Sequence, residues 1–396
     1  MDKVHVLFFH HAIGMGGAPR SLSMLIAGLD SQRYRKTVVM PRRMGNEKVK
    51  EMFHAAGAEV CEEQDVRPFN GSTVAPCRTL KARGYAVLAF NRMAKCASEV
   101  VDRIRPDIVH LNSTCLVGAA KGVKRFDASI PVLAHVREPL LGDWWGRNLA
   151  RMNRKYVDHF IGIDHYGLSS VGDVGSSRGT VVNNFVGEEF FEKAFTNAPS
   201  FRKKLGWSDD EIVFLSLSRI APANGCLEIA SLINESAGKL DPRARFVIAG
   251  FHSPKSEYET RVGAAIARSS VCDQMDFVDD PIALINAADV VVAPFTEPHS
   301  ARCVLEASAM GKPTLVSDMP NLTEMMSPGE SGEVFQWNDP SSFTASVNRL
   351  CEDSYRSACG RASYEVASRR FSQRENVKRT AQVYTQLLAT HGGTAC

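Results

Sequence analysis

The 396-residue sequence lacks the patterns that mark several classes of protein. Its ten cysteines form no C-x-x-C pair and most sit in apolar runs, so we expect reduced thiols rather than disulfides or a zinc site. No apolar run approaches the roughly 20 residues of a spanning helix, and Val4–Phe9 is too short for a signal peptide. No short repeat or low-complexity tract occurs. We expect a cytoplasmic protein whose membrane contact, if any, is peripheral, at the inner face.

Charge is unevenly distributed along the chain. Residues 1–184 hold 26 Lys and Arg against 17 Asp and Glu, whereas the remainder holds 21 against 27. A basic first half favours an anionic partner such as a lipid surface or a diphosphate acceptor, although scattered surface charge explains it equally well. No stretch resembles a nucleic-acid-binding module, so we expect no nucleic acid partner.

Short apolar runs alternate with helical patterns through most of the sequence, which predicts parallel sheets built from βαβ units. The alternation restarts after an irregular stretch, and the tail contains helical patterns only. We therefore expect an α/β protein with two Rossmann-like domains facing each other across a cleft. The expected parts are a first Rossmann-like domain at 1–185, a linker at 186–207, a second Rossmann-like domain at 208–375 and a C-terminal helix at 376–396 that packs back on the first domain.

A glycine loop, GMGGAPRSL, follows the first predicted strand and precedes a helix. Gly14, Gly16 and Gly17 let the backbone approach a ligand, and the helix start offers N–H groups to phosphate oxygens. Arg20 supports the phosphate interpretation. The alternative is a plain tight turn, because the full dinucleotide fingerprint is absent.

Polar residues also follow the later apolar runs of the first half. His110 and Asn112 end one predicted strand, and His135, Arg137 and Glu138 end another. Ligands of open α/β sheets bind outside such strand ends. Two strands that both present polar groups favour a site over isolated, internally satisfied side chains.

The second half repeats this arrangement. Arg219 ends the first strand of that half, and Asn224 precedes the next helix. A later strand is followed by a loop with Glu297 and Ser300 and by a helix containing Glu306. Loop amides at that helix start are suited to phosphate, and carboxylates are suited to sugar hydroxyls. The alternative for Glu306 is an exposed residue on a capped helix.

These segments together resemble a known family. The strings GGAPRSL, VVNNF, SRI…NG and EPHSARCVLEASAMGKPTLVSD…NLTEMM…GESGEVF resemble the glycine loop, the linker approach and the donor-site block of family 4 glycosyltransferases of the GT-B fold. The resemblance covers nearly the whole chain, and the last block is its most specific part. It implies transfer of a hexosyl or N-acetylhexosaminyl group from a nucleotide sugar to a lipid-linked, glycan or small-molecule acceptor, with retention of configuration.

The resemblance also implies roles for individual residues. It assigns catalysis to His135, Arg219 and Glu297. It assigns donor binding to Gly16, Gly17, Arg219, Asn224, Ser300, Arg302, Val304 and Glu306. It places Arg20, His110, Asn112, Arg137 and Glu138 on the acceptor side. No metal or other cofactor is implied, and the sequence has no D-x-D pair. Leaving-group charge would then be met by cationic side chains and N–H groups.

Two departures from the family pattern stand out. Asn224 occupies the position of a lysine, and eight residues rather than seven separate Glu297 from Glu306. Arg302, in the longer loop, is a candidate replacement for the missing charge. The alternative hypotheses are a weak or inactive homologue that binds a nucleotide sugar or a partner protein, and a related enzyme such as an epimerase.

The segment Leu140–Tyr156 combines Trp144 and Trp145 with arginines and a lysine. An aromatic pair beside basic residues suits a membrane interface or a lipid-diphosphate acceptor. An ordinary amphipathic helix with its tryptophans packed inside is the alternative.

Overall fold

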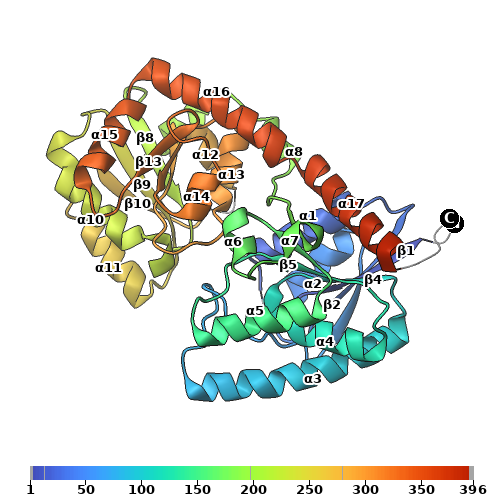
Figure 1. The fold of residues 1–396 in the computed structure, drawn as a ribbon. Helices are drawn as coiled ribbons and strands as arrows, with labels where there is room; N and C mark the ends of the chain where they lie inside the picture. The colour runs from blue at the N-terminus through green and yellow to red at the C-terminus, as the bar shows by residue number, and fades with distance from the viewer. Residues whose placement is uncertain (1–2, 13, 197, 279, 392–396) are drawn as a thin grey trace. The chain divides into compact units, whose positions relative to one another are not determined.

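The computed structural model describes residues 3–12, 14–196, 198–278 and 280–391 (Figure 1). The chain divides into two compact units. The first consists of Met1–Asn184 with Gln373–Cys396, and the second is Phe185–Ser372. Each unit contains one parallel sheet, and the chain ends in helices, which confirms the predicted α/β class with two Rossmann-like domains and a helical tail.

The first unit has a seven-stranded parallel sheet of order β3-β2-β1-β4-β5-β6-β7. Its inner strands are buried on both faces, as the continuous apolar run of β1 requires. The strands are β1 (Val4–Phe9), β2 (Tyr34–Pro41), β3 (Glu59–Glu63), β4 (Ile108–Leu111), β5 (Val132–Val136), β6 (His159–Gly162) and β7 (Gly179–Val181).

Helices cover the first sheet and connect its strands. They are α1 (Gly17–Gly28), α2 (Glu47–Ala55), α3 (Leu80–Ile104), η1 (Thr114–Leu116), α4 (Val117–Phe126), α5 (Trp144–Tyr156), α6 (His165–Ser169) and α7 (Gly175–Arg178). Helices α3, α4 and α5 lie side by side over the sheet (Figure 1). Thr79 and Asp143 cap α3 and α5 by accepting hydrogen bonds from first-turn N–H groups.

The C-terminal helix α17 (Gln373–His391) belongs to the first unit. It runs alongside α1, where a side chain at Gly28 would come within 2.7 Å of Val377. The buried amide of Asn376 donates to the Asn183 carbonyl oxygen at 3.1 Å. The tail therefore completes the first unit's core. Residues 392–396 of the expected helix lie outside the described part of the chain.

The second unit has a six-stranded parallel sheet of order β10-β9-β8-β11-β12-β13. The strands are β8 (Ile212–Leu217), β9 (Ala244–Phe251), β10 (Cys272–Asp276), β11 (Val290–Ala293), β12 (Thr314–Ser317) and β13 (Gly332–Phe335). The helices are α8 (Glu188–Phe191), α9 (Pro199–Lys204), η2 (Pro222–Asn224), α10 (Cys226–Ser236), η3 (Ala237–Lys239), α11 (Glu257–Ile266), α12 (Pro281–Ala287), α13 (Arg302–Ala309), α14 (Pro320–Glu324), α15 (Pro340–Leu350) and α16 (Asp353–Arg370).

The segment expected as a linker, 186–207, lies within the second unit. Val186 donates its N–H to the Phe371 carbonyl oxygen at 3.1 Å, just before the chain leaves this unit. Trp207 is buried in the same core as strand β11.

Candidate functional site

Each sheet has one point where the strand order reverses. In the first unit it lies between β1 and β4, and in the second between β8 and β11. Loops that leave the carboxyl ends of two such strands diverge to opposite faces and leave room for a ligand. The polar residues picked out in the sequence follow these strands and their neighbours.

The glycine loop leaves β1 at the first of these points. Gly14 has a positive φ of 74°, which favours glycine, and its N–H donates to Asn46 Oδ1 at 3.2 Å. Asn46 is buried and was not singled out in the sequence. Gly16 precedes the first turn of α1 without a side-chain cap, and no atom lies within 4 Å of a side-chain carbon placed there. Arg20 is exposed on α1.

His110 and His135, from β4 and β5, are brought together in the interior. His110 Nε2 lies 2.7 Å from His135 Nδ1, and the rings stack at 4.8 Å. His110 Nδ1 lies 2.5 Å from the hydroxyl of Tyr384 on α17. Burial lowers the pKa of both histidines well below the usual value, and Arg137 lowers it further. Both rings are therefore neutral, and His135 Nε2 makes no hydrogen bond to any described residue.

A second buried network joins the loops after β1, β4 and β5. Arg137 donates to Asn112 Oδ1 at 2.7 Å and to Asn184 Oδ1 at 3.0 Å. The Asn112 amide nitrogen lies 3.0 Å from His10 Nδ1, which must then accept. Burial lowers the pKa of His10 to about 3 and so keeps that nitrogen unprotonated.

Glu138 lies outside both networks. Its Oε1 accepts a hydrogen bond from Ser113 Oγ at 3.2 Å, and burial raises the pKa of its carboxyl group. The first unit thus gathers His110, Asn112, His135 and Arg137, while Arg20 is on the surface. Sequence analysis singled out neither Tyr384 nor His10, which the structure places in these two networks.

The second reversal point is built around Asn224. This residue is 6% exposed, and its amide donates to the Arg219 carbonyl oxygen at 2.6 Å. Its Oδ1 lies 2.7 Å from His299 Nε2. The His299 ring stacks on Phe295 with centroids 4.3 Å apart, and the Arg219 side chain is exposed.

Gly225, which follows Asn224, is required by close packing. Its φ is +67°, and a Cβ would stand 1.7 Å from the Pro294 carbonyl oxygen. This approach holds the loop after β8 against the loop after β11. Asn224 and His299 meet for that reason.

Of the two glutamates, Glu297 and Glu306, only Glu306 is buried. Its Oε1 accepts from Arg302 Nε at 3.1 Å, and both side chains are largely buried, which rules out the exposed-helix alternative. Glu297 is exposed in the loop. Ser300 is half-buried next to α13. The Val304 side chain is fully buried in the apolar core, so the structure does not bring it to the polar cluster.

The two tryptophans at the start of α5 differ in burial. Trp145 is buried, stacks on Phe69 and donates to the Asn70 carbonyl oxygen at 2.7 Å, as the amphipathic-helix alternative requires. Trp144 is 63% exposed. No helix in the described residues has the length and apolar character needed to span a bilayer.

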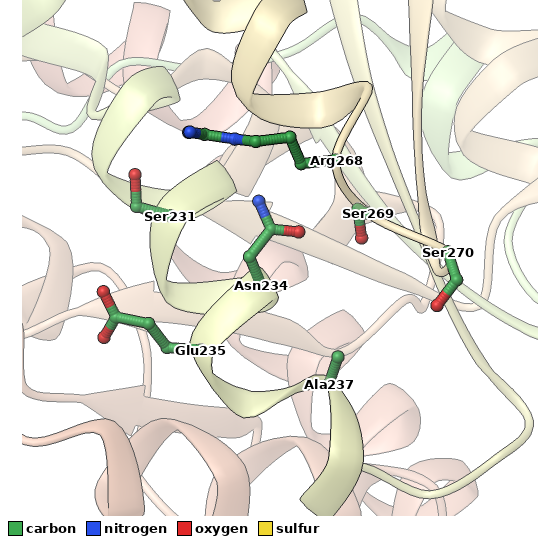
Figure 2. Close-up of a pocket in the computed structure, with 7 residues that line it drawn as sticks. All are labelled: Ser231, Asn234, Glu235, Ala237, Arg268, Ser269 and Ser270. Carbon is green, nitrogen blue, oxygen red and sulfur yellow. The ribbon is translucent and has the colours of Figure 1, made fainter.

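A pocket of about 330 Å³ lies elsewhere in the second unit and shares no lining residue with these loops. Figure 2 shows its polar lining, contributed by α10 and by the turn between α11 and β10. That turn precedes β10, so the pocket lies at the amino ends of the strands rather than at the carboxyl ends. It plays no part in the candidate site.

The cysteines in the described part of the chain are free, and all but Cys61 are buried. Burial raises the pKa of Cys115 and Cys303 to about 12, so these thiols stay protonated. Among the described residues, no three His, Cys, Asp or Glu side chains are grouped so as to hold a metal ion.

Comparison with known proteins finds a family match within the second unit. Residues 197–366 match the family described as glycosyl transferases group 1. The chain is 25% identical over 197 residues to a D-inositol 3-phosphate glycosyltransferase of Acidothermus cellulolyticus, covering 48% of this chain and 44% of that protein. It is 27% identical over 229 residues to the Thermobispora bispora protein of the same name, covering 53% and 51%. The chain thus spans about half the length of the curated relatives it matches.

Solved structures match the whole chain in fold. The Anabaena protein HepE, crystallised with UDP and glucose, has a TM-score of 0.74 at 17% identity, covering 97% of this chain and 100% of that one. A Rickettsia africae glycosyltransferase has a TM-score of 0.77 at 13% identity, covering 98% and 99%. Residues 197–366 thus carry the glycosyltransferase group 1 match, and the chain as a whole has the fold of GT-B glycosyltransferases.

Proposed function

We propose that this chain transfers a hexosyl or N-acetylhexosaminyl group from a nucleotide sugar to a hydroxyl of a lipid-linked, glycan or small-molecule acceptor, with retention of configuration. The observation that carries the proposal is the cluster of Arg219, Asn224 and His299 at the reversal point of the second sheet. This cluster lies within the residues that match the glycosyltransferase group 1 family. The bound UDP and glucose of the Anabaena neighbour support UDP-glucose as the first donor to test.

Each cluster has a chemical role in this proposal. Arg219, exposed at the end of β8, stabilises the negative charge that develops on the departing diphosphate. Glu306, paired with Arg302, accepts hydrogen bonds from ribose hydroxyls. Neutral His135, whose Nε2 makes no hydrogen bond to a described residue, hydrogen-bonds the sugar or the acceptor.

The first experiment measures donor binding and transfer with the purified chain. Thermal shift with UDP-glucose, GDP-mannose and ADP-glucose identifies a donor, because a ligand of the native state raises the unfolding temperature. Release of the nucleoside diphosphate is then followed with and without a candidate acceptor such as an inositol phosphate. Binding without turnover over the whole acceptor panel would favour the weak or inactive homologue, an alternative that the buried Asn224 in place of a lysine supports.

We further propose that transfer needs no metal. In this proposal Arg219 supplies the charge stabilisation that a divalent ion supplies in other enzymes. Turnover should therefore be unchanged in excess EDTA. Loss of turnover that Mn²⁺ or Mg²⁺ restores would contradict this.

A lipid surface is the acceptor environment that the first unit favours. Leu80, Tyr85 and Leu88 at the start of α3 are more than half exposed, and so is Trp144 at the start of α5. Arg83 lies 3.5 Å from Asp143, which joins the two helix starts. Exposed apolar side chains at two helix starts, with the basic Arg83 between them in this link, suit peripheral membrane contact.

Vesicle flotation with anionic and neutral lipids tests this contact. Leu80→Ser with Leu88→Ser should reduce flotation with anionic vesicles, whereas Met44→Ser, which alters a 94% exposed methionine elsewhere, should not. Equal flotation of all three proteins would contradict the proposal.

A further inference from the structure

His299 has an unusual pair of hydrogen-bonding partners. Its Nε2 lies 2.7 Å from Asn224 Oδ1, and its Nδ1 lies 2.8 Å from the Glu297 carbonyl oxygen. The orientation of the Asn224 amide is fixed, because its nitrogen donates to the Arg219 carbonyl oxygen at 2.6 Å. Both ring nitrogens of His299 therefore face atoms that only accept hydrogen bonds. A neutral imidazole carries one N–H and satisfies one of them, whereas an imidazolium satisfies both.

Without a ligand, the groups around His299 disfavour the doubly protonated form of its ring. Burial is the largest effect and lowers the pKa of His299, and Arg219 lowers it as well. The Glu297 carbonyl oxygen and carboxylate act in the opposite direction. Two further contacts of His299 are uncharged: Phe295 stacks on the ring, and Asn321 of α14 donates to the His299 carbonyl oxygen. The His299 ring therefore has hydrogen-bond acceptors for two N–H groups, but desolvation disfavours the doubly protonated ring.

We propose that His299 takes up a proton when an anionic diphosphate binds beside Arg219, and that the Asn224–His299 pair thereby supplies a second cation to the donor site. This inference rests on the proposed function. A diphosphate offsets the repulsion from Arg219 and adds an attraction for the imidazolium. Asn224 and the Glu297 carbonyl oxygen, which are already in place, then accept the two N–H bonds without rearrangement.

Proton uptake has a measurable consequence for affinity. Binding of the donor raises the pKa of the ring, so between its free and bound values each bound donor takes up as much as one proton. Within that window the dissociation constant falls as the pH falls, by up to about tenfold per pH unit. Above the window the donor binds to a neutral ring and the dependence ends.

The test is calorimetry with UDP-glucose and GDP-mannose, whose diphosphates carry no terminal phosphate that titrates near neutrality. Each titration is repeated in two buffers of different ionisation enthalpy between pH 6 and pH 8. We expect proton uptake approaching one with the wild-type chain and none with His299→Gln. The matched control, His54→Gln on α2 of the first unit, should keep the wild-type uptake.

The outcomes separate the two proposals. Binding without proton uptake, or uptake that persists in His299→Gln, would overturn this inference and leave the donor site intact. No binding of any nucleotide sugar would overturn the proposed function itself. If His299→Gln does not fold, ¹⁵N NMR of histidine-labelled wild-type chain decides: one ring must become doubly protonated as UDP-glucose is added.

Discussion

The two reversal points use histidine in opposite ways. In the first unit, His110 faces a tyrosine hydroxyl and another imidazole, groups that both donate and accept, so neutral rings satisfy every contact between them. In the second unit, His299 faces two acceptors and is fully satisfied only as a cation. The same side chain therefore forms a buried neutral pair in one unit and, in our proposal, a proton-dependent group beside the diphosphate in the other.

This contrast predicts that sugar transfer depends strongly on the positive charge of Arg219 in the second unit. Arg219→Ala should lower transfer by about 100-fold or more, because charge stabilisation of the leaving group is lost. The fold should be unaffected, since the side chain is exposed. Steady-state kinetics with the identified donor measures the effect. Arg361→Ala, an exposed arginine on α16, is the matched control and should retain wild-type turnover. Near-wild-type turnover in folded Arg219→Ala would reject the assignment.

The neutral histidines of the first unit predict a dependence of stability on pH. Burial lowers the pKa of His10 to about 3 and that of His11 to about 4, against 6.5 when unfolded. The unfolded chain therefore binds more protons below pH 6.5. Stability should be complete above that value and fall as the pH drops toward 4, by up to about 1.4 kcal/mol per pH unit for each histidine.

Hydrogen exchange measured between pH 7 and pH 5 shows which unit loses stability as the pH falls. Peptides of the first unit should lose protection more steeply than those of the second. In urea unfolding, His10→Gln should reduce the slope with pH, whereas His54→Gln, at an exposed position, should leave it unchanged. Equal slopes in the two units would remove this part of the contrast.

Much of the fold could be predicted from sequence because central strands are continuously apolar. The sequence predicts strands at Val4–Phe9, Asp107–Leu111, Ile212–Ser218 and Asp289–Phe295; strand β1 has the predicted bounds, and β4, β8 and β11 lie within the other three ranges. No strand is predicted at β3 or β13, and β10 begins two residues before its predicted range, Gln274–Val278. All three are edge strands, which are partly exposed and carry polar residues that hide the strand pattern.

The candidate site was harder to predict because its contacts are distant in sequence. Residues at strand ends, such as His110 and Arg219, could be picked out individually. Tyr384 lies 274 residues from His110, and nothing in the helical pattern of the tail shows which residue it meets. Likewise, the orientation of the Asn224 amide, which gives His299 its chemistry, depends on a backbone carbonyl.

Tyr384→Phe tests whether the hydroxyl holds the histidine pair. Removing it leaves His110 Nδ1 buried without a partner, which should cost about 1–3 kcal/mol of unfolding free energy. Urea unfolding measures this loss. Tyr364→Phe on α16, in the second unit, is the matched control and should change stability little, because no hydrogen bond of that hydroxyl to a described residue is found. An unchanged unfolding free energy in Tyr384→Phe would show that the hydroxyl contributes nothing to the pair.

The smallest change in affinity is expected for Asn224→Lys, which brings a permanent cation to the second reversal point. Taken alone, an added bond from a cation to phosphate contributes about 1–3 kcal/mol. Against this, Asn224 is buried, and the substitution removes its bonds to the Arg219 carbonyl oxygen and to His299. The lysine also keeps the neighbouring ring neutral, so one cation replaces another. We therefore expect the donor dissociation constant to change by less than about tenfold and proton uptake to disappear.

The calorimetry described for His299→Gln measures both the dissociation constant and the proton uptake of Asn224→Lys. Arg302→Ala serves as the comparison, because Arg302 is paired with Glu306 and its loss should weaken donor binding without affecting proton uptake. A much tighter donor complex of Asn224→Lys that still takes up a proton would show that the site lacks a cation which His299 does not provide.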